Sequence, residues 1–194
     1  MARILQTLYG LPSRSAQELG DAINSYQPNV EDYPDDEFGL LSCRLAYQAV
    51  QLGNFGIGCV LVDSSGDIVE QGFNELFNPY FRSDRHGEMV VMDAFEENNK
   101  SITSMADYTL YTSLESCPMC LARLITSGVG TVKYVSPDLD GGMVHLMTNL
   151  PKIWQELAAR QKFPQASVSS LLVQLAFDTF MLNADELNSK IVNR

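Results

Sequence analysis

The sequence predicts a three-layer α/β domain with a mixed central sheet. One observation is the order of the patterns along the chain: helix, hairpin, helix, strand, helix, strand, helix. The other is size and composition, because 194 residues with 45% apolar side chains suit one domain with a full hydrophobic core.

Two helices are expected in the N-terminal third. Residues 13–27 read as a short helix with a serine cap, and 36–52 carry apolar residues at helical spacing. The acidic segment 31–37 between them is interpreted as a solvated linker that also caps the second helix.

A hairpin follows. GIGCVLVD (56–63) is rich in branched apolar residues and predicts a buried strand, SSGD (64–67) is a turn, and IVEQGFN (68–74) is the returning strand. After a loop, the pattern continues with a helix, a strand, a helix that stops at Gly128, and a strand: 86–99, 108–114, 116–128 and 131–136. The remainder is mostly helical, with one apolar face formed by Val168, Leu171, Leu172, Leu175 and Ala176.

The net charge of −11 argues against a nucleic-acid partner, because an acidic excess repels phosphate backbones. It favours a small-molecule partner, although the charge can equally serve solubility alone. No apolar run reaches the length of a membrane span, and the first residues lack an apolar core of signal-peptide length. A cytoplasmic location is therefore expected.

Cys117 and Cys120 in SCPMC are three residues apart, which places both side chains on one face at the start of a helix. The helix dipole there favours thiolates, the form that binds zinc. Alone, such a pair is equally a redox pair, half of a structural zinc site, or chance. The other two cysteines, Cys43 and Cys59, read as small core residues.

His86 and Glu88 in HGE lie at the start of another expected helix. Taken singly, they read as a capping histidine and a first-turn acid. Together with the two cysteines, His86 gives three ligands and an open fourth position, which is the arrangement of a catalytic zinc. Glu88 is then placed to move a proton from water that zinc acidifies.

HGE and SCPMC, roughly thirty residues apart, resemble the signature of the zinc-dependent cytidine deaminase superfamily, nearest to its nucleobase and tRNA adenosine deaminase branch. The resemblance covers about residues 36–140. It implies a cytidine deaminase-like fold and hydrolytic deamination, with His86, Cys117 and Cys120 as zinc ligands and Glu88 as general acid/base. By the same resemblance, Asn74 in GFN is a substrate-binding candidate. We assign 1–35 to an N-terminal extension and 36–194 to the deaminase domain with a helical C-terminal segment.

The sequence departs from the family pattern in each of the two motifs. Ser116 stands where members usually have proline, and Pro118 falls between the two cysteines instead. Proline is well tolerated early in a helix, so the helix start and the zinc site are expected to survive. Gly87 occupies a position where many members have alanine, which does not fix a substrate.

The expected substrate is a free nucleobase or nucleoside, of guanine or cytosine type, and the expected assembly is a homodimer. The alternatives are a deaminase of the tRNA wobble adenosine and a non-catalytic zinc-stabilised subunit, which the intact Glu88 argues against. The aromatic residues of loop 75–85 either stack on a base or pack the loop onto the core: Phe77, Tyr80 and Phe81. Asp138 or Asp140 is a candidate for contacting an amine, whereas Trp154 and the C-terminal helices are expected in the core or a dimer contact.

Overall fold

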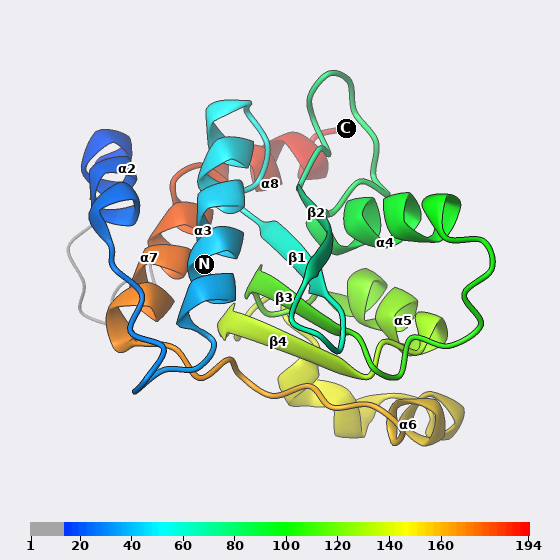
Figure 1. Ribbon diagram of the computed structural model, residues 1–194. Helices are drawn as coiled ribbons and strands as arrows, with labels where there is room; N and C mark the ends of the chain where they lie inside the picture. Colours follow the sequence, from blue (N-terminus) through cyan, green and yellow to red (C-terminus); the bar gives the residue numbers. More distant parts are fainter. Residues whose placement is uncertain (1–13) are drawn as a thin grey trace.

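A four-stranded mixed sheet forms the centre of the molecule (Figure 1). The computed structural model describes residues 14–194. The strands lie in the order β2 (Ile68–Phe73), β1 (Gly58–Val62), β3 (Thr109–Leu114) and β4 (Thr131–Ser136). β1 runs antiparallel to both β2 and β3, whereas β3 and β4 are parallel. The predicted fold class, a three-layer domain with a mixed sheet, is confirmed.

Helices α4 (Gly87–Asn98) and α5 (Pro118–Ser127) cover one face of the sheet. Side chains alternate between the two faces of a strand, so Cys59 and Leu61 of β1 face this layer. They form one fully buried cluster with residues of α4, α5 and the neighbouring strands: Val91, Met92, Phe95, Leu110, Leu124 and Val132. This cluster holds the first turns of α4 and α5 close to the sheet.

The opposite face is covered by α3 (Asp36–Gln51) and α7 (Ser170–Met181), with α2 (Ala16–Ser25) packed outside them. Ser15 caps α2 through a capping box with Glu18, as the expected serine cap required. Because α2 shares a buried cluster with α3 and α7, part of the predicted N-terminal extension belongs to the core. Residues 1–13 of that extension lie outside the described part of the chain, and the boundary at 35 stays a prediction.

Buried acids tie the start of α3 to the segment that leads into α7. Asp36 accepts hydrogen bonds from the Tyr26 hydroxyl and the Ser169 amide, and Asp35 accepts them from Lys133 and the Ser167 amide. Burial of a carboxylate is tolerated when such donors replace water. The acidic segment is therefore partly a structural anchor, whereas the sequence predicted a solvated linker.

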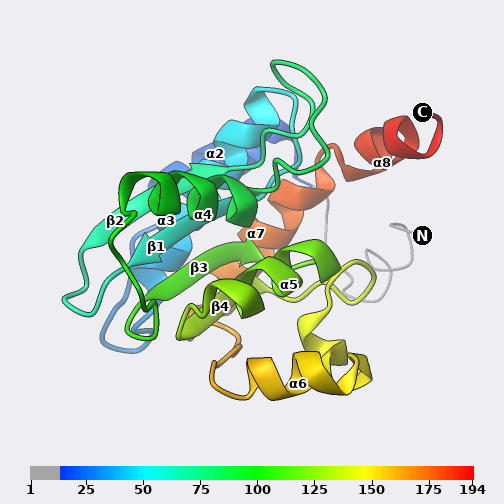
Figure 2. The same cartoon turned by 90° about the vertical axis from the view of Figure 1, so that its right-hand side faces the viewer.

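The C-terminal third adds η1 (Val144–Asn149) and α6 (Lys152–Ala158) beside α5, and ends in α8 (Ala184–Val192). Trp154 packs with Leu121 and Ile125 of α5, which confirms its expected core role. Figure 2 shows α8 projecting from the end of α7, beside the end of the molecule at which α4 begins. Within residues 14–194, no helix has the length and apolar character needed to cross a membrane.

The backbones of β1 and α3 approach each other closely at Gly58. A Cβ atom at this position would lie 2.3 Å from the Ser42 carbonyl oxygen and 2.5 Å from the Ala46 nitrogen. Both are backbone atoms, so the clash could be relieved only by moving the helix away from the strand. Strand β1 thus begins at Gly58, the third residue of GIGCVLVD, where only glycine fits against the backbone of α3.

We expect Gly58→Ala to lower the free energy of unfolding by about 3 kcal/mol, because overpacking against rigid backbone is costly. Gly66→Ala is the matched control, since Gly66 has open space around it and only a positive φ of 87°. Its cost should be about 1 kcal/mol. Urea unfolding followed by circular dichroism measures both, and equal losses would contradict the close approach.

Candidate metal and active site

The site lies at one edge of the sheet, where β2, β3 and β4 end and β1 begins. Asn74 follows β2, Cys117 follows β3 and Asp138 follows β4. Because β1 is antiparallel to its neighbours, its start lies at the same edge. Ligands of open α/β sheets commonly bind at the carboxyl ends of the strands.

His86 is the N-cap residue of α4, and Glu88 lies in the first turn of that helix. The preceding loop 75–85 is closed at its base, where the Glu75 amide donates to the Arg85 carbonyl. The two side chains of these residues also form an ion pair at 2.6 Å. This closure fixes the point at which the chain enters α4, and with it the position of His86.

Cys117 is the N-cap residue of α5, and Cys120 is the third residue of the helix. Pro118 opens the helix, where its missing N–H costs nothing. The segment between β3 and α5 is held on both sides, since the Glu115 amide donates to Ser136 and the Met143 amide to the Ser116 carbonyl. The prediction that both cysteines lie at a helix start is confirmed.

The N-termini of α4 and α5 lie next to each other. Ligand atoms of His86, Cys117 and Cys120 all lie within 4.8 Å of one another. The Nδ1 of His86 is 3.5 Å from the Cys117 Sγ, close to the separation of about 3.6 Å expected for nitrogen and sulfur ligands of a tetrahedral zinc. One imidazole and two thiols are also the donor types that zinc prefers. The three side chains therefore fit a zinc ion with a fourth position left open.

The electrostatics of the cluster favour a thiolate on Cys117. The hydrogen bond from the Cys120 thiol, helped by His86, outweighs burial and lowers the pKa of Cys117 to about 4. The pKa of Cys120 is raised because its thiol donates that hydrogen bond and because it is buried. The positive ends of two helices stabilise a thiolate at this point.

Glu88 is buried, with 2% of its surface exposed. Burial, and then the negative charge of Cys117, raise the pKa of its carboxyl group. The Ser116 hydroxyl donates a hydrogen bond of 2.9 Å to the Glu88 Oε1. A carboxylate in this setting is suited to taking up and releasing a proton.

Asn74 is fully buried and has an unpaired donor. Its Oδ1 accepts a hydrogen bond from the Leu76 amide, whereas its Nδ2 has no partner among the described residues. A buried amide without a partner is costly. Because Asn74 also lines the cavity described next, its NH₂ group is available to an acceptor on a ligand.

A cavity of about 860 Å³ opens in front of His86, Cys117 and Glu88. Five acidic residues line it: Glu88, Glu115, Asp138, Asp140 and Asp185. Among the described residues that line it there is no lysine or arginine. Asp138 presents one oxygen to the amides of Asp140 and Gly141, and burial raises the pKa of its carboxyl group.

The far wall of the cavity corrects one prediction. The C-terminal helices were expected in the core or a dimer contact, and α7 does pack in the core. However, Phe180 at the end of α7 and several α8 residues also line the cavity: Ala184, Asp185, Asn188, Ser189, Ile191 and Val192. Sequence analysis missed them because no local motif marks them. They reach the site only because the chain turns after α7 and packs Ala184 and Leu187 against Phe55 and Leu76.

The aromatic residues of loop 75–85 take the second of their two expected roles. Phe77 and Phe81 pack on the cluster of Phe55 and Leu76, and Tyr80 is 64% exposed. The aromatic residues that line the cavity are Phe55 and Phe180, whose ring centroids are 6.2 Å apart. The flat apolar surfaces near the metal site therefore come from elements that the sequence motif does not include.

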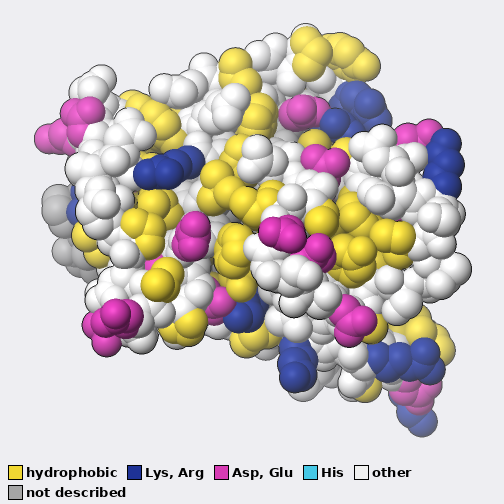
Figure 3. All heavy atoms as spheres, viewed as in Figure 1, with side chains coloured by type: hydrophobic (Ala, Val, Ile, Leu, Met, Phe, Trp, Pro, Cys, Tyr) yellow, Lys and Arg dark blue, Asp and Glu magenta, His cyan; other side chains and the backbone are white. Residues whose placement is uncertain are grey.

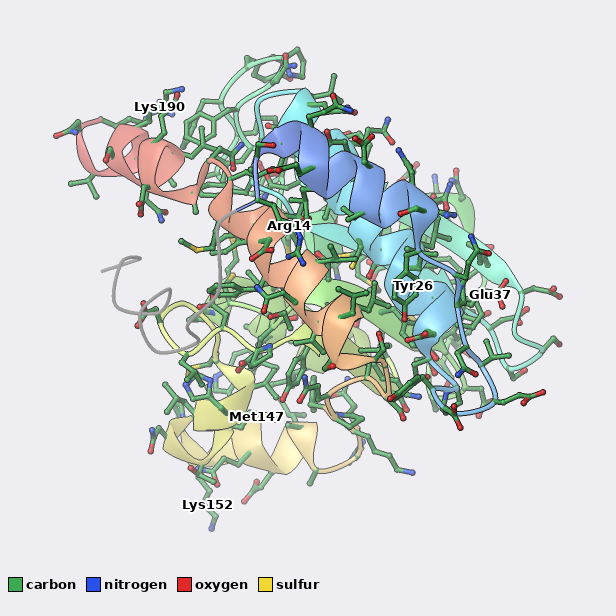
Figure 4. All side chains as sticks on the ribbon, turned by 90° about the vertical axis from the view of Figure 1, so that its left-hand side faces the viewer. Arg14, Tyr26, Glu37, Met147, Lys152 and Lys190 are labelled. Carbon is green, nitrogen blue, oxygen red and sulfur yellow. The ribbon has the colours of Figure 1, made fainter. Side chains whose placement is uncertain are left out.

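The basic residues nearest the motifs are engaged with acids. Arg82 pairs with Asp84, Arg85 with Glu75, and Arg123 with Glu96 at 2.8 Å. On the face shown in Figure 3, basic side chains are scattered among acidic ones. In Figure 4, the labelled Lys152 and Lys190 lie far apart, on α6 and α8. No concentrated cationic patch is seen on the face shown in Figure 3.

Comparison with known proteins relates this arrangement to one family. Residues 33–136 match the sequence model of the cytidine and deoxycytidylate deaminase zinc-binding region. A tRNA-specific adenosine deaminase of Bacillus subtilis is 36% identical over 107 residues, 54% of this chain and 63% of that protein. The chloroplastic tRNA(adenine(34)) deaminase of Arabidopsis thaliana is 33% identical over 129 residues, 63% of this chain and 10% of that protein. The chain thus spans less than two thirds of either relative.

Solved structures share the fold. A guanine deaminase from Nitrosomonas europaea superposes with a TM-score of 0.60 at 19% identity, covering 90% of this chain and 94% of its own. A structure from a study of A-to-I editing by tRNA:A34 deaminases gives a TM-score of 0.56 at 23% identity, covering 66% of this chain and 96% of its own. The expected cytidine deaminase-like fold is confirmed.

We expect the purified protein to contain about one zinc ion per chain, because three converging ligands suffice for tight binding. Cys117→Ala should lose most of it. Cys43→Ala is the matched control, because Cys43 is buried in the α2–α3–α7 cluster away from the site. Elemental analysis after dialysis measures the metal content, and full zinc occupancy in Cys117→Ala would refute the ligand assignment.

Proposed function

Because the chain belongs to the cytidine and deoxycytidylate deaminase zinc-binding family, whose members are hydrolytic enzymes acting on C–N bonds, we propose that it deaminates a free nucleobase or nucleoside. The observation that carries this choice is the cavity, which joins the metal site to a wall of acidic and aromatic side chains. The cytoplasmic location and homodimer expected from the sequence stay predictions.

Each motif residue has a role in this proposal. His86, Cys117 and Cys120 hold zinc, which when bound supplies an activated water near neutral pH. Glu88 would accept one proton from that water and deliver it to a ring nitrogen. It would then pass the second proton, from the hydroxyl group that has added to the ring, to the amine, which leaves as ammonia. The raised pKa of its buried carboxyl group brings it closer to the range in which both transfers are efficient.

Asn74 and Asp138 are proposed to orient the base. The unpaired Nδ2 of Asn74 offers a donor to a carbonyl oxygen or ring nitrogen. The Asp138 side chain offers acceptors to N–H groups, since only its Oδ1 is engaged with described residues. Guanine and cytosine carry both a carbonyl oxygen and an amine, which favours them over a base without a carbonyl.

The charge of the cavity favours a substrate without phosphate. Five carboxylates line it, and Arg82, Arg85 and Arg123 are already paired with acids. A phosphate group would meet repulsion there, and no lysine or arginine of residues 14–194 lines the cavity to balance it. A neutral base that offers N–H donors would instead find acceptors on several sides.

The alternative is deamination of an adenosine in tRNA. It is supported by the names of the Bacillus and Arabidopsis relatives, which are tRNA deaminases. That activity requires affinity for a polyanion, whereas this chain has 13 basic and 24 acidic residues. We therefore rank the free base or nucleoside first.

Glu88→Gln should lower kcat by about 10²–10⁴, the scale for loss of a general acid/base. The substitution keeps the shape of the side chain but removes the group that carries the proton. Glu70→Gln, a change of the same kind on β2 and outside the cavity lining, is the control. Zinc content should be unchanged in both variants, and near-normal turnover by Glu88→Gln would eliminate the proposed role.

Ammonia release should occur with a free base or nucleoside and not with a tRNA anticodon stem-loop. The panel comprises guanine, cytosine, adenine, their nucleosides and the stem-loop, each tested with wild-type protein and Glu88→Gln at low and physiological salt. Inosine in the stem-loop together with no ammonia from any free base or nucleoside would promote the alternative.

A further inference from the structure

Ser116 contacts the proposed acid/base directly. Its hydroxyl donates a 2.9 Å hydrogen bond to the Oε1 of Glu88, and the two residues are 1% and 2% exposed. A hydrogen bond to a charged group is stronger than one between neutral groups, and burial keeps water from replacing it. The contact links the end of β3 to the first turn of α4.

The backbone fixes the position of this hydroxyl. On one side, the Glu115 amide donates to the Ser136 carbonyl at 2.9 Å; on the other, Ser116 itself accepts the Met143 amide at 2.9 Å. The next residue, Cys117, begins α5. Ser116 therefore cannot drift away from Glu88 without disturbing the metal helix or the cavity wall.

The surroundings of Glu88 make this donor significant. The side chains whose charges act on it include His86 and Cys117, and Glu88 in turn influences Cys59 and Cys120. Cys117 and Cys120 have no proton to donate once they bind metal as thiolates. Among the described residues, the Ser116 hydroxyl is then the neutral side-chain donor to this carboxylate, beside the backbone amide of Glu88 itself. Proline, the usual residue at this position in the family, has no side-chain donor.

We propose that Ser116 is a positioning residue for the deamination: its hydroxyl holds one oxygen of the Glu88 carboxylate, so that the other oxygen faces the reacting proton. This inference rests on the proposed function, because it assigns Glu88 the proton transfer. It concerns the orientation of the carboxylate, and Ser116 itself is not among the described residues that line the cavity.

Ser116→Ala should lower kcat by about tenfold to a hundredfold, the factor that corresponds to a hydrogen bond to a charged group. KM should stay within about twofold, and zinc content should not change, since Ser116 neither lines the cavity nor belongs to the three metal ligands. Ser42→Ala is the matched control, because Ser42 is equally buried but donates to the Gly39 carbonyl on α3. Wild-type kcat in Ser116→Ala would overturn the proposal.

Ser116→Thr and Ser116→Val separate the hydroxyl from the shape. The two side chains fill nearly the same volume, but only threonine can donate to Glu88. Threonine should retain several-fold more turnover than valine. Equal loss in both variants would mean that the position acts through packing alone, and would overturn the proposal.

A measurement that needs no turnover keeps this test separate from the proposed function. The infrared carboxylate band of Glu88 is isolated as the difference between the zinc-loaded wild type and Glu88→Gln. The band should shift in Ser116→Ala and stay in place in Ser42→Ala. If no substrate in the panel is deaminated, the proposed function fails and this shift alone decides the contact, whose absence would overturn the inference.

Discussion

The site depends on bringing the N-termini of two helices together. His86 and Cys117 are the N-cap residues of α4 and α5, and Glu88 and Cys120 lie in the first turns. β1 and β3 are neighbours in the sheet. The buried cluster between the sheet and the two helices holds α4 and α5 in place relative to each other. Free amides and the helix dipoles concentrate positive potential where two thiolates and a carboxylate converge. Without that potential, three anionic groups within one buried site would repel one another strongly.

The carboxylates that line the cavity also need groups that stabilise their negative charge. A zinc ion with two thiolates has little net positive charge, so the carboxylates around it are not neutralised by the metal. Glu115 is instead stabilised by donors from the chain, namely the amides of Asp138 and His145 at 3.1 and 2.9 Å. His145 also places its Nδ1 2.7 Å from this carboxylate. These bonds fix the segment that carries Asp138 against the end of β3. Under the proposed function, an acidic cavity with such a wall would favour ligands that offer N–H groups.

Site residues that lie in short sequence motifs could be predicted, whereas those that reach the site through contacts between distant segments could not. HGE and SCPMC are short, and a helix start within each segment is enough to place His86, Glu88, Cys117 and Cys120. The far wall depends on the turn after α7, which lets α8 pack on Phe55, almost 130 positions earlier in the chain. The sequence of α8 alone does not predict that contact. The sequence left two roles open for the aromatic residues of loop 75–85 for a related reason, because the apolar partners of Phe77 and Phe81 lie in that same cluster.

The two departures from the family motif have local physical causes. At Gly87, a Cβ atom would lie 3.1 Å from the Cys59 Sγ and 3.3 Å from the Ile57 carbonyl oxygen, which is tighter than ordinary packing. Glycine there therefore leaves room for the sulfur that β1 places under α4. At Ser116, the hydroxyl has a partner in Glu88. Both residues lie beside Glu88, the proposed acid/base, and neither is one of the three side chains that converge as metal ligands. Changes between the ligands are compatible with a zinc site, because binding depends on the type and position of the ligand atoms.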